Sequence, residues 1–308
     1  MEINQFSNIV WCDLEIVILK IHSYQPWDTK MVHTCQMPNL SKPIVNIFIC
    51  RENDIIFDNL KTYRENIMRH GFYLGHHFGL PANLKYIDDN NIAFFHHDPG
   101  KIIWCYVIKF VLTLHANKRN MLHIKSGAVA YKGKSFLVLG RGGSGKTEVI
   151  KALCKNGASF MANTHLLING NSACGIKSNI RVRDNGCEVY IPISQQQNGN
   201  VYEGWLPIGG VFWVNYRTDG ITLIENIATH YAMPNLLWFT ESIGNWEMKE
   251  DIADYYNSDP FEFAEQINKI DKMLNDFCEN NNIYYLNLDI YSSEGMQKTI
   301  SLMENNLK

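Results

Sequence analysis

One eight-residue segment has the residue types and the spacing needed to hold a phosphate group. Residues 140–147 read Gly-Arg-Gly-Gly-Ser-Gly-Lys-Thr, which fits the pattern G-x-x-x-x-G-K-[ST] at every fixed position. Glycines let successive main-chain N–H groups turn toward an anion, because no Cβ stands in the way. Lys146 could then neutralise the terminal phosphates of ATP, and the Thr147 hydroxyl could bind Mg²⁺. The residues predicted to line this site are Gly140, Gly142, Gly143, Ser144, Gly145, Lys146, Thr147 and Glu148.

The neighbouring residues predict the elements that would position this loop. Apolar runs on either side of Lys132-Gly133-Lys134 predict a β-hairpin over residues 128–139, whose second strand leads into the loop. Residues 147–154 are compatible with a helix that ends near Gly157, and residues 158–162 form a further strand. A strand, a loop, a helix and a strand within about thirty residues predict a βαβ unit with parallel strands.

With its surroundings, the loop resembles the HPr serine kinase family, which belongs with the phosphoenolpyruvate carboxykinase-like P-loop proteins. The resemblance rests on His123 before the loop, on Gly145-Lys146-Thr147-Glu148 at its end, and on KNGASFMAN over residues 155–163. It covers about residues 101–167 well and the rest of the C-terminal half loosely. It implies an ATP- and Mg²⁺-dependent kinase that transfers the γ-phosphoryl group to a small molecule or a peptide side chain. The first hundred residues show no such likeness.

The chain departs from the family at the catalytic position. The resemblance implies two aspartates after the strand that follows the loop's helix, the first a base for the acceptor hydroxyl and both partners of the metal. Asn163 and Thr164 stand there instead. An amide cannot accept a proton at neutral pH, although its carbonyl oxygen can orient an acceptor or hold a metal-bound water. Three possibilities follow: another group supplies the base, the acceptor needs no base, or the chain has lost phosphoryl transfer.

Two histidines are candidates for the missing role. His165 lies two residues after Asn163, so an extended strand would place both side chains on one face, about 6.6 Å apart. The alternative is a histidine that is hydrogen-bonded at the end of a strand. His123, which the resemblance implies, could contact the phosphates or the acceptor, or could be a satisfied histidine within the fold.

Two arginines are candidates for binding the acceptor. Arg181 and Arg183 alternate with apolar residues, so a strand would place both guanidinium groups on one face. Two such groups suit a phosphate or a carboxylate. Asp184 could pair with either arginine or replace the missing base. The alternative is a solvated, charged strand.

Two patterns resemble metal sites but are interpreted structurally. The run IYYLNLD ends in Asp289, 143 residues after Lys146, and is predicted to be the last strand of the sheet. The doublets His76-His77 and His96-His97 lack the spacing of a metal site and are predicted to be surface histidines.

Composition limits the class of protein. With 308 residues, 46% of them hydrophobic, the chain can bury a full core, which rules out general disorder. A formal net charge of −3 argues against nucleic acid as a main partner. The apolar run at residues 102–114 contains Lys109 and is too short to cross about 30 Å of hydrocarbon, so no membrane partner is expected. Eight cysteines without a C-x-x-C pair indicate a cytoplasmic protein.

The predicted fold class is α/β, with a P-loop kinase domain of the HPr kinase and PEP carboxykinase-like type over residues 101–308. An N-terminal α+β region of unknown role precedes it over residues 1–100, with a boundary at Asp98-Pro99-Gly100 and a helix from 101 to 116. The predicted function is that of an ATP-dependent kinase. The alternatives are a non-catalytic nucleotide-binding module and an ATP-dependent ligase that acts through an acyl phosphate. A homo-oligomer is implied by the resemblance alone.

Overall fold

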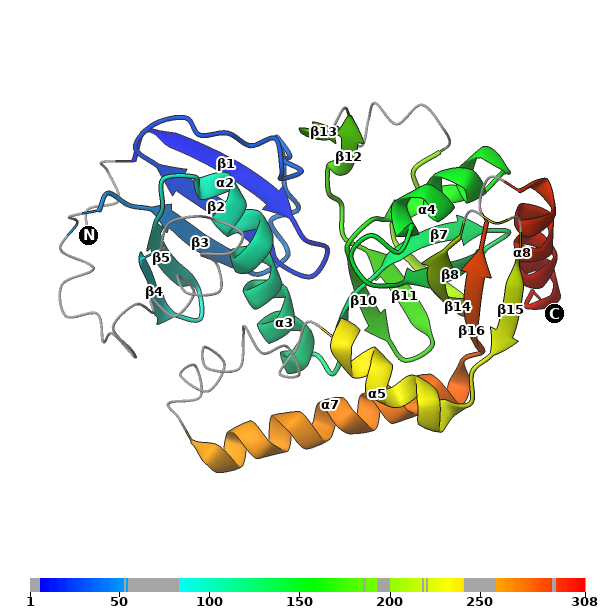
Figure 1. Ribbon diagram of the computed structural model, residues 1–308. Helices are drawn as coiled ribbons and strands as arrows, with labels where there is room; N and C mark the ends of the chain where they lie inside the picture. Colours follow the sequence, from blue (N-terminus) through cyan, green and yellow to red (C-terminus); the bar gives the residue numbers. More distant parts are fainter. Residues whose placement is uncertain are drawn as a thin grey trace. The chain divides into compact units, whose positions relative to one another are not determined.

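The computed structural model describes residues 6–52, 54, 83–184, 187–192, 200–217, 219, 221–240, 259–289 and 292–307. The chain divides into two compact units, drawn in Figure 1. The first unit contains residues 1–115, 179–192 and 246–263, and the second contains residues 116–178, 193–245 and 264–308. This grouping assigns residues 99–115 to the first unit, whereas the turn at Asp98-Pro99-Gly100 had suggested a boundary before them.

The first unit is built on a mixed five-stranded sheet in the order β1-β2-β3-β5-β4. Its strands are β1 (Asn8–Asp13), β2 (Ile18–Ser23), β3 (Ile44–Ile49), β4 (Asn83–Asp88) and β5 (Asn91–Phe95). The central strands β2, β3 and β5 run parallel, and β1 and β4 pair antiparallel at the two edges. The parallel strands are more buried than the edge strand β1, as expected for the parallel part of a sheet.

A helical segment follows β5 and confirms the helix predicted over residues 101–116. It consists of α2 (Pro99–Ile102), the π-helical turn η3 (Ile103–Val107) and α3 (Ile108–Lys118). The Asp98 carboxylate caps its start by accepting a hydrogen bond from Lys101 N at 3.3 Å. Residues at helical spacing, among them Tyr106 and Phe110, are buried.

The second unit is built on a mixed nine-stranded sheet that contains the glycine-rich loop. Its strands are β6 (Leu122–Lys125), β7 (Gly127–Tyr131), β8 (Lys134–Leu139), β9 (Ser159–Ala162), β10 (His165–Asn169), β11 (Ser172–Gly175), β14 (Trp205–Tyr216), β15 (Leu223–Asn226) and β16 (Ile283–Leu288). The long strand β14 joins two parts of this sheet. Its beginning pairs antiparallel with β11, and its end lies between β8 and β16, parallel to both. The carboxyl ends of β8, β14 and β16 therefore meet at one edge, where folds of this kind bind ligands.

The strands around the loop agree with most of the sequence prediction. The predicted hairpin is β7–β8, and both turn residues, Lys132 and Gly133, have positive φ angles of 46° and 82°. Because β7 pairs antiparallel with both β8 and β9, these two strands run parallel, as predicted, with β7 between them. The described sheets and helices agree with the predicted mixed α/β class.

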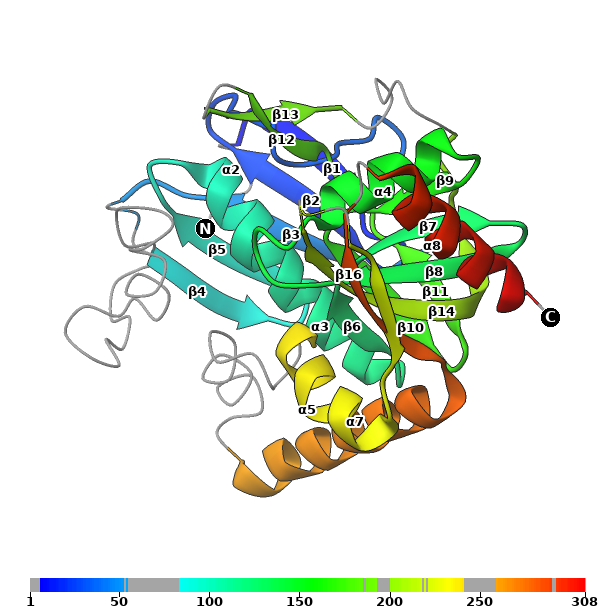
Figure 2. The same ribbon diagram turned by 45° about the vertical axis from the view of Figure 1, so that its right-hand side comes forward.

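The described residues that belong wholly or mostly to the second unit also form the helices α4 (Lys146–Lys155), α5 (Thr229–Phe239), α7 (Pro260–Asn280) and α8 (Ser293–Asn305). Helices α4 and α8 lie side by side, as Figure 2 shows. Gly157, with a φ of 95°, follows α4 and ends it as predicted. None of the described helices combines the length and the apolar character that crossing a membrane requires.

Several cysteines are packing residues. Burial raises the pKa of Cys50 to about 12 and the pKa of Cys154 and Cys278 to about 11. Their thiols stay protonated at neutral pH, which makes them poor nucleophiles. Burial of this kind is typical of cysteines that act as small core residues.

Candidate functional site

The glycine-rich loop follows β8 directly and leads into α4. Gly143 and Gly145 have φ angles of 81° and 88°, in the left-handed region that favours glycine. A Cβ at Gly145 would lie 3.0 Å from Tyr216 Cβ, and a Cβ at Gly140 would lie 2.8 Å from Val214 O. Glycine is therefore required at both ends of the loop, because the neighbouring strand β14 approaches it closely.

The lysine of the loop contacts the loop's own main chain. Lys146 Nζ donates hydrogen bonds to Gly140 O at 2.6 Å and to Arg141 O at 2.9 Å. The main-chain N–H of Ser144 donates to Arg141 O at 3.1 Å, so this amide closes a turn inside the loop. The Ser144 hydroxyl is buried and has no hydrogen-bond partner among the described residues. The positive charge is thus held at the loop, where terminal phosphates would have to compete with two carbonyl groups.

The predicted metal ligand, Thr147, contacts Asn163, which stands where the resemblance implies an aspartate. Thr147 Oγ1 donates a hydrogen bond to Asn163 Oδ1 at 3.2 Å. Asn163 lies in the bend after β9, which confirms its predicted place at the end of that strand. A Cβ at Gly127 of β7 would lie 3.5 Å from Asn163 O, so β7 packs closely against this bend.

These two side-chain oxygens fit a magnesium ion by chemistry and by separation. Neighbouring oxygens around an octahedral Mg²⁺ lie about 3 Å apart, because each Mg–O distance is about 2.0–2.1 Å. The observed distance of 3.2 Å is close to this value. Within the described residues, no group of three or more His, Cys, Asp or Glu could hold a metal ion. Phosphate oxygens of a nucleotide would have to supply further ligands.

Glu148, the last residue predicted to line the phosphate site, lies on the surface of α4. Its carboxylate forms a salt bridge with Lys151 Nζ at 3.0 Å, one helical turn further along. About half of the Glu148 side chain is exposed.

The two candidate histidines form a buried pair. His123 in β6 and His165 in β10 belong to neighbouring antiparallel strands, and their Nε2 and Nδ1 atoms lie 3.1 Å apart. The exposed fractions of the two residues are 0% and 1%. The prediction that Asn163 and His165 share one strand was wrong, because β9 ends at Ala162 and β10 begins at His165, with a bend between them. Each ring is hydrogen-bonded inside the fold, as in the alternative interpretation.

The candidate arginines lie on a different element from the loop. Arg181, Arg183 and Asp184 belong to β12 (Ile180–Asp184), which pairs antiparallel with β13 (Cys187–Ile191). The predicted strand is confirmed, whereas the side chains of these three residues lie outside the described part of the structure. Strand β12 belongs to the first compact unit, and the loop belongs to the second.

Sequence reasoning missed the residues at the end of β14. Tyr216 packs against Gly145, and Arg217 Nε donates to Asp219 Oδ1 at 3.0 Å just beyond the strand. No short-range pattern in the sequence indicates that the end of β14 lies against the loop, because this contact depends on the pairing of distant segments. Asp289 follows β16, the last strand along the chain as predicted, and is 8% exposed.

The histidine doublets gave a mixed result. His76-His77 lies outside the described residues. The prediction of a surface position was wrong for His96, which is 4% exposed. Its Nδ1 accepts a hydrogen bond from Asp98 N at 2.9 Å, which explains how the fold accommodates the buried ring.

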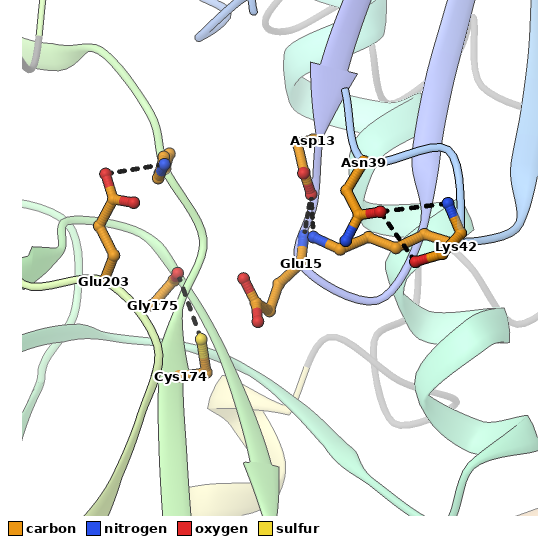
Figure 3. A network of polar contacts seen from close by, with 9 residues as sticks. Asp13, Glu15, Asn39, Lys42, Cys174, Gly175 and Glu203 are labelled. Atoms are coloured by element: carbon orange, nitrogen blue, oxygen red, sulfur yellow. Dashed lines mark hydrogen bonds and ion pairs between the residues drawn. The ribbon is translucent and has the colours of Figure 1, made fainter. Parts of the chain in front are cut away.

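Polar contacts elsewhere in each unit are paired charges and turn contacts (Figure 3). In the first unit, Asp13 Oδ1 accepts hydrogen bonds from Lys42 Nζ at 2.7 Å and from Glu15 N at 2.9 Å. In the second unit, Glu203 pairs with Lys177 at 2.8 Å. These contacts compensate charge locally.

Comparison with known proteins adds little. No family model matches the chain, and no curated protein matches it. A solved structure of the Hpr(Ser) kinase/phosphatase from Coxiella burnetii is similar over 34% of this chain and 77% of that chain, with 14% sequence identity and a TM-score of 0.26. A similarity this weak establishes neither a family nor an activity.

Proposed function

We propose that this chain is a kinase that binds Mg²⁺ and ATP at residues 140–147 and transfers the γ-phosphoryl group to a small molecule or a peptide side chain. The observation that carries the proposal is the loop between β8 and α4. Gly140 and Gly145 stand where a Cβ would crowd β14, the lysine contacts the loop, and the threonine contacts Asn163.

The start of α4 suits a phosphate chain. The first N–H groups of a helix have no partner within the helix, and the helix dipole places partial positive charge there. Gly145 is the N-cap residue and has no side chain to occupy these groups. Lys146 would exchange its two carbonyl contacts for phosphate oxygens, and it would keep its charge beside them.

Thr147 and Asn163 would hold the metal ion, each through a neutral oxygen. A magnesium ion held there would supply positive charge to offset the negative charge that develops on the phosphate oxygens. The Asn163 amide could orient the acceptor hydroxyl but could not take its proton. The acceptor oxygen would form its bond to the γ-phosphorus as the bond to the leaving ADP oxygen breaks. The hydroxyl proton would pass to a phosphate oxygen or to water.

A missing base lowers the rate of such a reaction without preventing it. Positioning and charge neutralisation supply most of the catalysis of phosphoryl transfer, and a general base contributes about 10²–10⁴-fold. The activity proposed here is therefore slow with hydroxyl acceptors.

Asn163 also favours a second candidate, a nucleotide-binding module without turnover. His123 and His165, the histidines considered as replacement bases, are buried against each other. A module of this kind would bind nucleotide through Lys146 and the loop but would not transfer the phosphoryl group.

Transfer of label from [γ-³²P]ATP to a panel of hydroxyl-bearing small molecules and serine or threonine peptides tests the proposal. Label in an acceptor that depends on Mg²⁺ and disappears in Lys146→Met supports the kinase. Tight binding of nucleotide without transfer to any acceptor supports the module and contradicts the kinase. Absence of nucleotide binding contradicts both.

A further inference from the structure

A hollow of about 430 Å³ lies between α4 and α8, which run side by side in Figure 2. Helix α4 is the helix that follows the glycine-rich loop, and α8 is the last helix of the chain. A volume of this size is within the range of pockets that bind small molecules or a few peptide residues. We call this hollow the α4–α8 groove.

Both apolar and polar residues line the groove. Ala152, Met296 and Ile300 supply the apolar surface, and Met296 is only 6% exposed. Ser292 and Ser293 also line the groove, and the Ser292 side chain caps α8 by accepting a hydrogen bond from Gly295 N. A lining that offers both apolar surface and hydrogen-bonding groups suits a peptide side chain together with its main chain.

The charges lining the groove favour an anion. Two lysines and one glutamate line it, which gives a net charge of +1 on a chain whose formal net charge is −3. Lys151 is already paired with Glu148 at 3.0 Å. The described part of the chain provides no salt-bridge partner for Lys155, which stands in the last turn of α4. A carboxylate bound in the groove would pair with Lys155 in this last turn.

One residue that lines the groove is adjacent to the loop in sequence. Glu148 follows the predicted metal ligand Thr147 immediately. Glu148 and Lys155 are seven residues apart, which corresponds to about 10 Å along a helix. Three residues of extended peptide span about the same length.

We propose that the α4–α8 groove binds the acceptor of the reaction, and that this acceptor is an acidic peptide segment. Its hydroxyl residue lies at the Glu148 end, an aliphatic side chain covers Met296, and a carboxylate about three residues away pairs with Lys155. This proposal rests on the proposed kinase function, because only a nucleotide at the loop gives the hydroxyl residue a phosphoryl donor.

The methionine in the groove provides a direct probe. The protein would be labelled with [methyl-¹³C]methionine, and the Met296 resonance would be assigned with Met296→Leu. The labelled protein would be titrated with acetyl-Ser-Leu-Asp-Asp-amide and, separately, with the uncharged matched peptide acetyl-Ser-Leu-Asn-Asn-amide. Met303, which is buried on the same helix and does not line the groove, is the internal control.

We expect the acidic peptide to shift the Met296 resonance saturably, and the amide peptide to bind at least tenfold more weakly. Lys155→Glu lowers the affinity for the acidic peptide at least tenfold. Lys272→Glu, an equal change of charge at an exposed position of α7, leaves it within twofold. Lys155→Gln provides a second variant that removes the charge without reversing it, and it should weaken binding in the same direction.

Three results would overturn the assignment: no shift of Met296 at millimolar peptide, equal affinity for the two peptides, or equal effects of Lys155→Glu and Lys272→Glu. An equal shift produced by succinate at the same concentration would overturn the choice of a peptide. Binding of ATP, measured separately by calorimetry, keeps the two proposals apart. If the peptide binds and the nucleotide does not, the kinase function is contradicted, whereas the groove is still supported as a peptide-binding site.

Discussion

Two groups of side chains in the second unit have residue types suited to chemistry, and their surroundings differ. Lys146 and Thr147 lie at the edge of the sheet, where they contact main-chain carbonyl groups and the amide of Asn163. His123 and His165 lie inside the sheet region, almost without exposure, and contact each other. A ligand can displace the first set of contacts without disturbing the core, whereas the second set is part of the core. Access therefore separates a candidate site from a structural pair more clearly than residue type does.

The largest effect is expected at Lys146. Lys146→Ala removes the positive charge nearest to the predicted phosphates, and charge-assisted hydrogen bonds are stronger than neutral ones. We expect the affinity for Mg·ATP to fall by about 10²-fold, equivalent to about 2.7 kcal/mol. Isothermal titration calorimetry measures the change, with Lys272→Ala as the matched surface control. A Kd within threefold of that of the unmodified protein would contradict the assigned role.

Asn163 comes next, because it stands where the resemblance implies the aspartate that acts as the base. Asn163→Asp restores a carboxylate beside Thr147, and we expect phosphoryl transfer or basal ATP hydrolysis to rise by about 10²-fold, the lower range for a general base. Initial rates at saturating Mg·ATP measure it. Unchanged rates would show that this position does not face the reacting groups.

Two glycines of the same loop offer a matched pair. Gly145→Ala forces a Cβ into a left-handed conformation and to 3.0 Å from Tyr216 Cβ, at a cost of about 1–2 kcal/mol. Gly142→Ala meets no atom within 4 Å, so its effect should stay below about 0.5 kcal/mol. Urea unfolding should show lower stability only for Gly145→Ala. Calorimetry on the folded proteins should show about tenfold weaker nucleotide binding only for the same variant. Equal effects would contradict the geometry described for the loop.

The histidine pair should show the smallest effect on nucleotide binding. His123→Leu leaves the partner ring buried with one hydrogen bond fewer, which should lower the free energy of unfolding by about 1–3 kcal/mol. The affinity for Mg·ATP should stay within twofold. A double-mutant cycle with His165→Leu should give a coupling of about 1 kcal/mol in stability. A tenfold loss of nucleotide affinity without a loss of stability would show that the pair belongs to the nucleotide site rather than to the core.

Much of the local structure near the loop could be predicted from the sequence. The hairpin β7–β8, the loop, α4 and β9 follow from short-range signals, such as alternating apolar residues and glycines at positions with positive φ. The place of Asn163 after β9 could be predicted as well, because it depends on the end of one strand. These features extend over a few residues each, so the sequence carries them directly.

Features that depend on pairing between distant segments could not be predicted. The approach of Tyr216 to Gly145 requires β14 to lie beside β8, and the contact between His123 and His165 requires β6 to lie beside β10. The shared face predicted for Asn163 and His165 was wrong because a two-residue bend looks like continuous strand in a short apolar sequence. The groove between α4 and α8 likewise joins residues more than a hundred positions apart.

The glycine amides of the loop provide the most direct test of the central claim, that residues 140–147 bind the phosphates of a nucleotide. In the protein labelled with [¹⁵N]glycine, we predict that stoichiometric Mg·ATP shifts the amide resonances of Gly140, Gly142, Gly143 and Gly145, while glycines remote from the loop, such as Gly170, stay in place. Unchanged loop resonances at millimolar nucleotide would contradict the account, and so would shifts confined to glycines outside the loop.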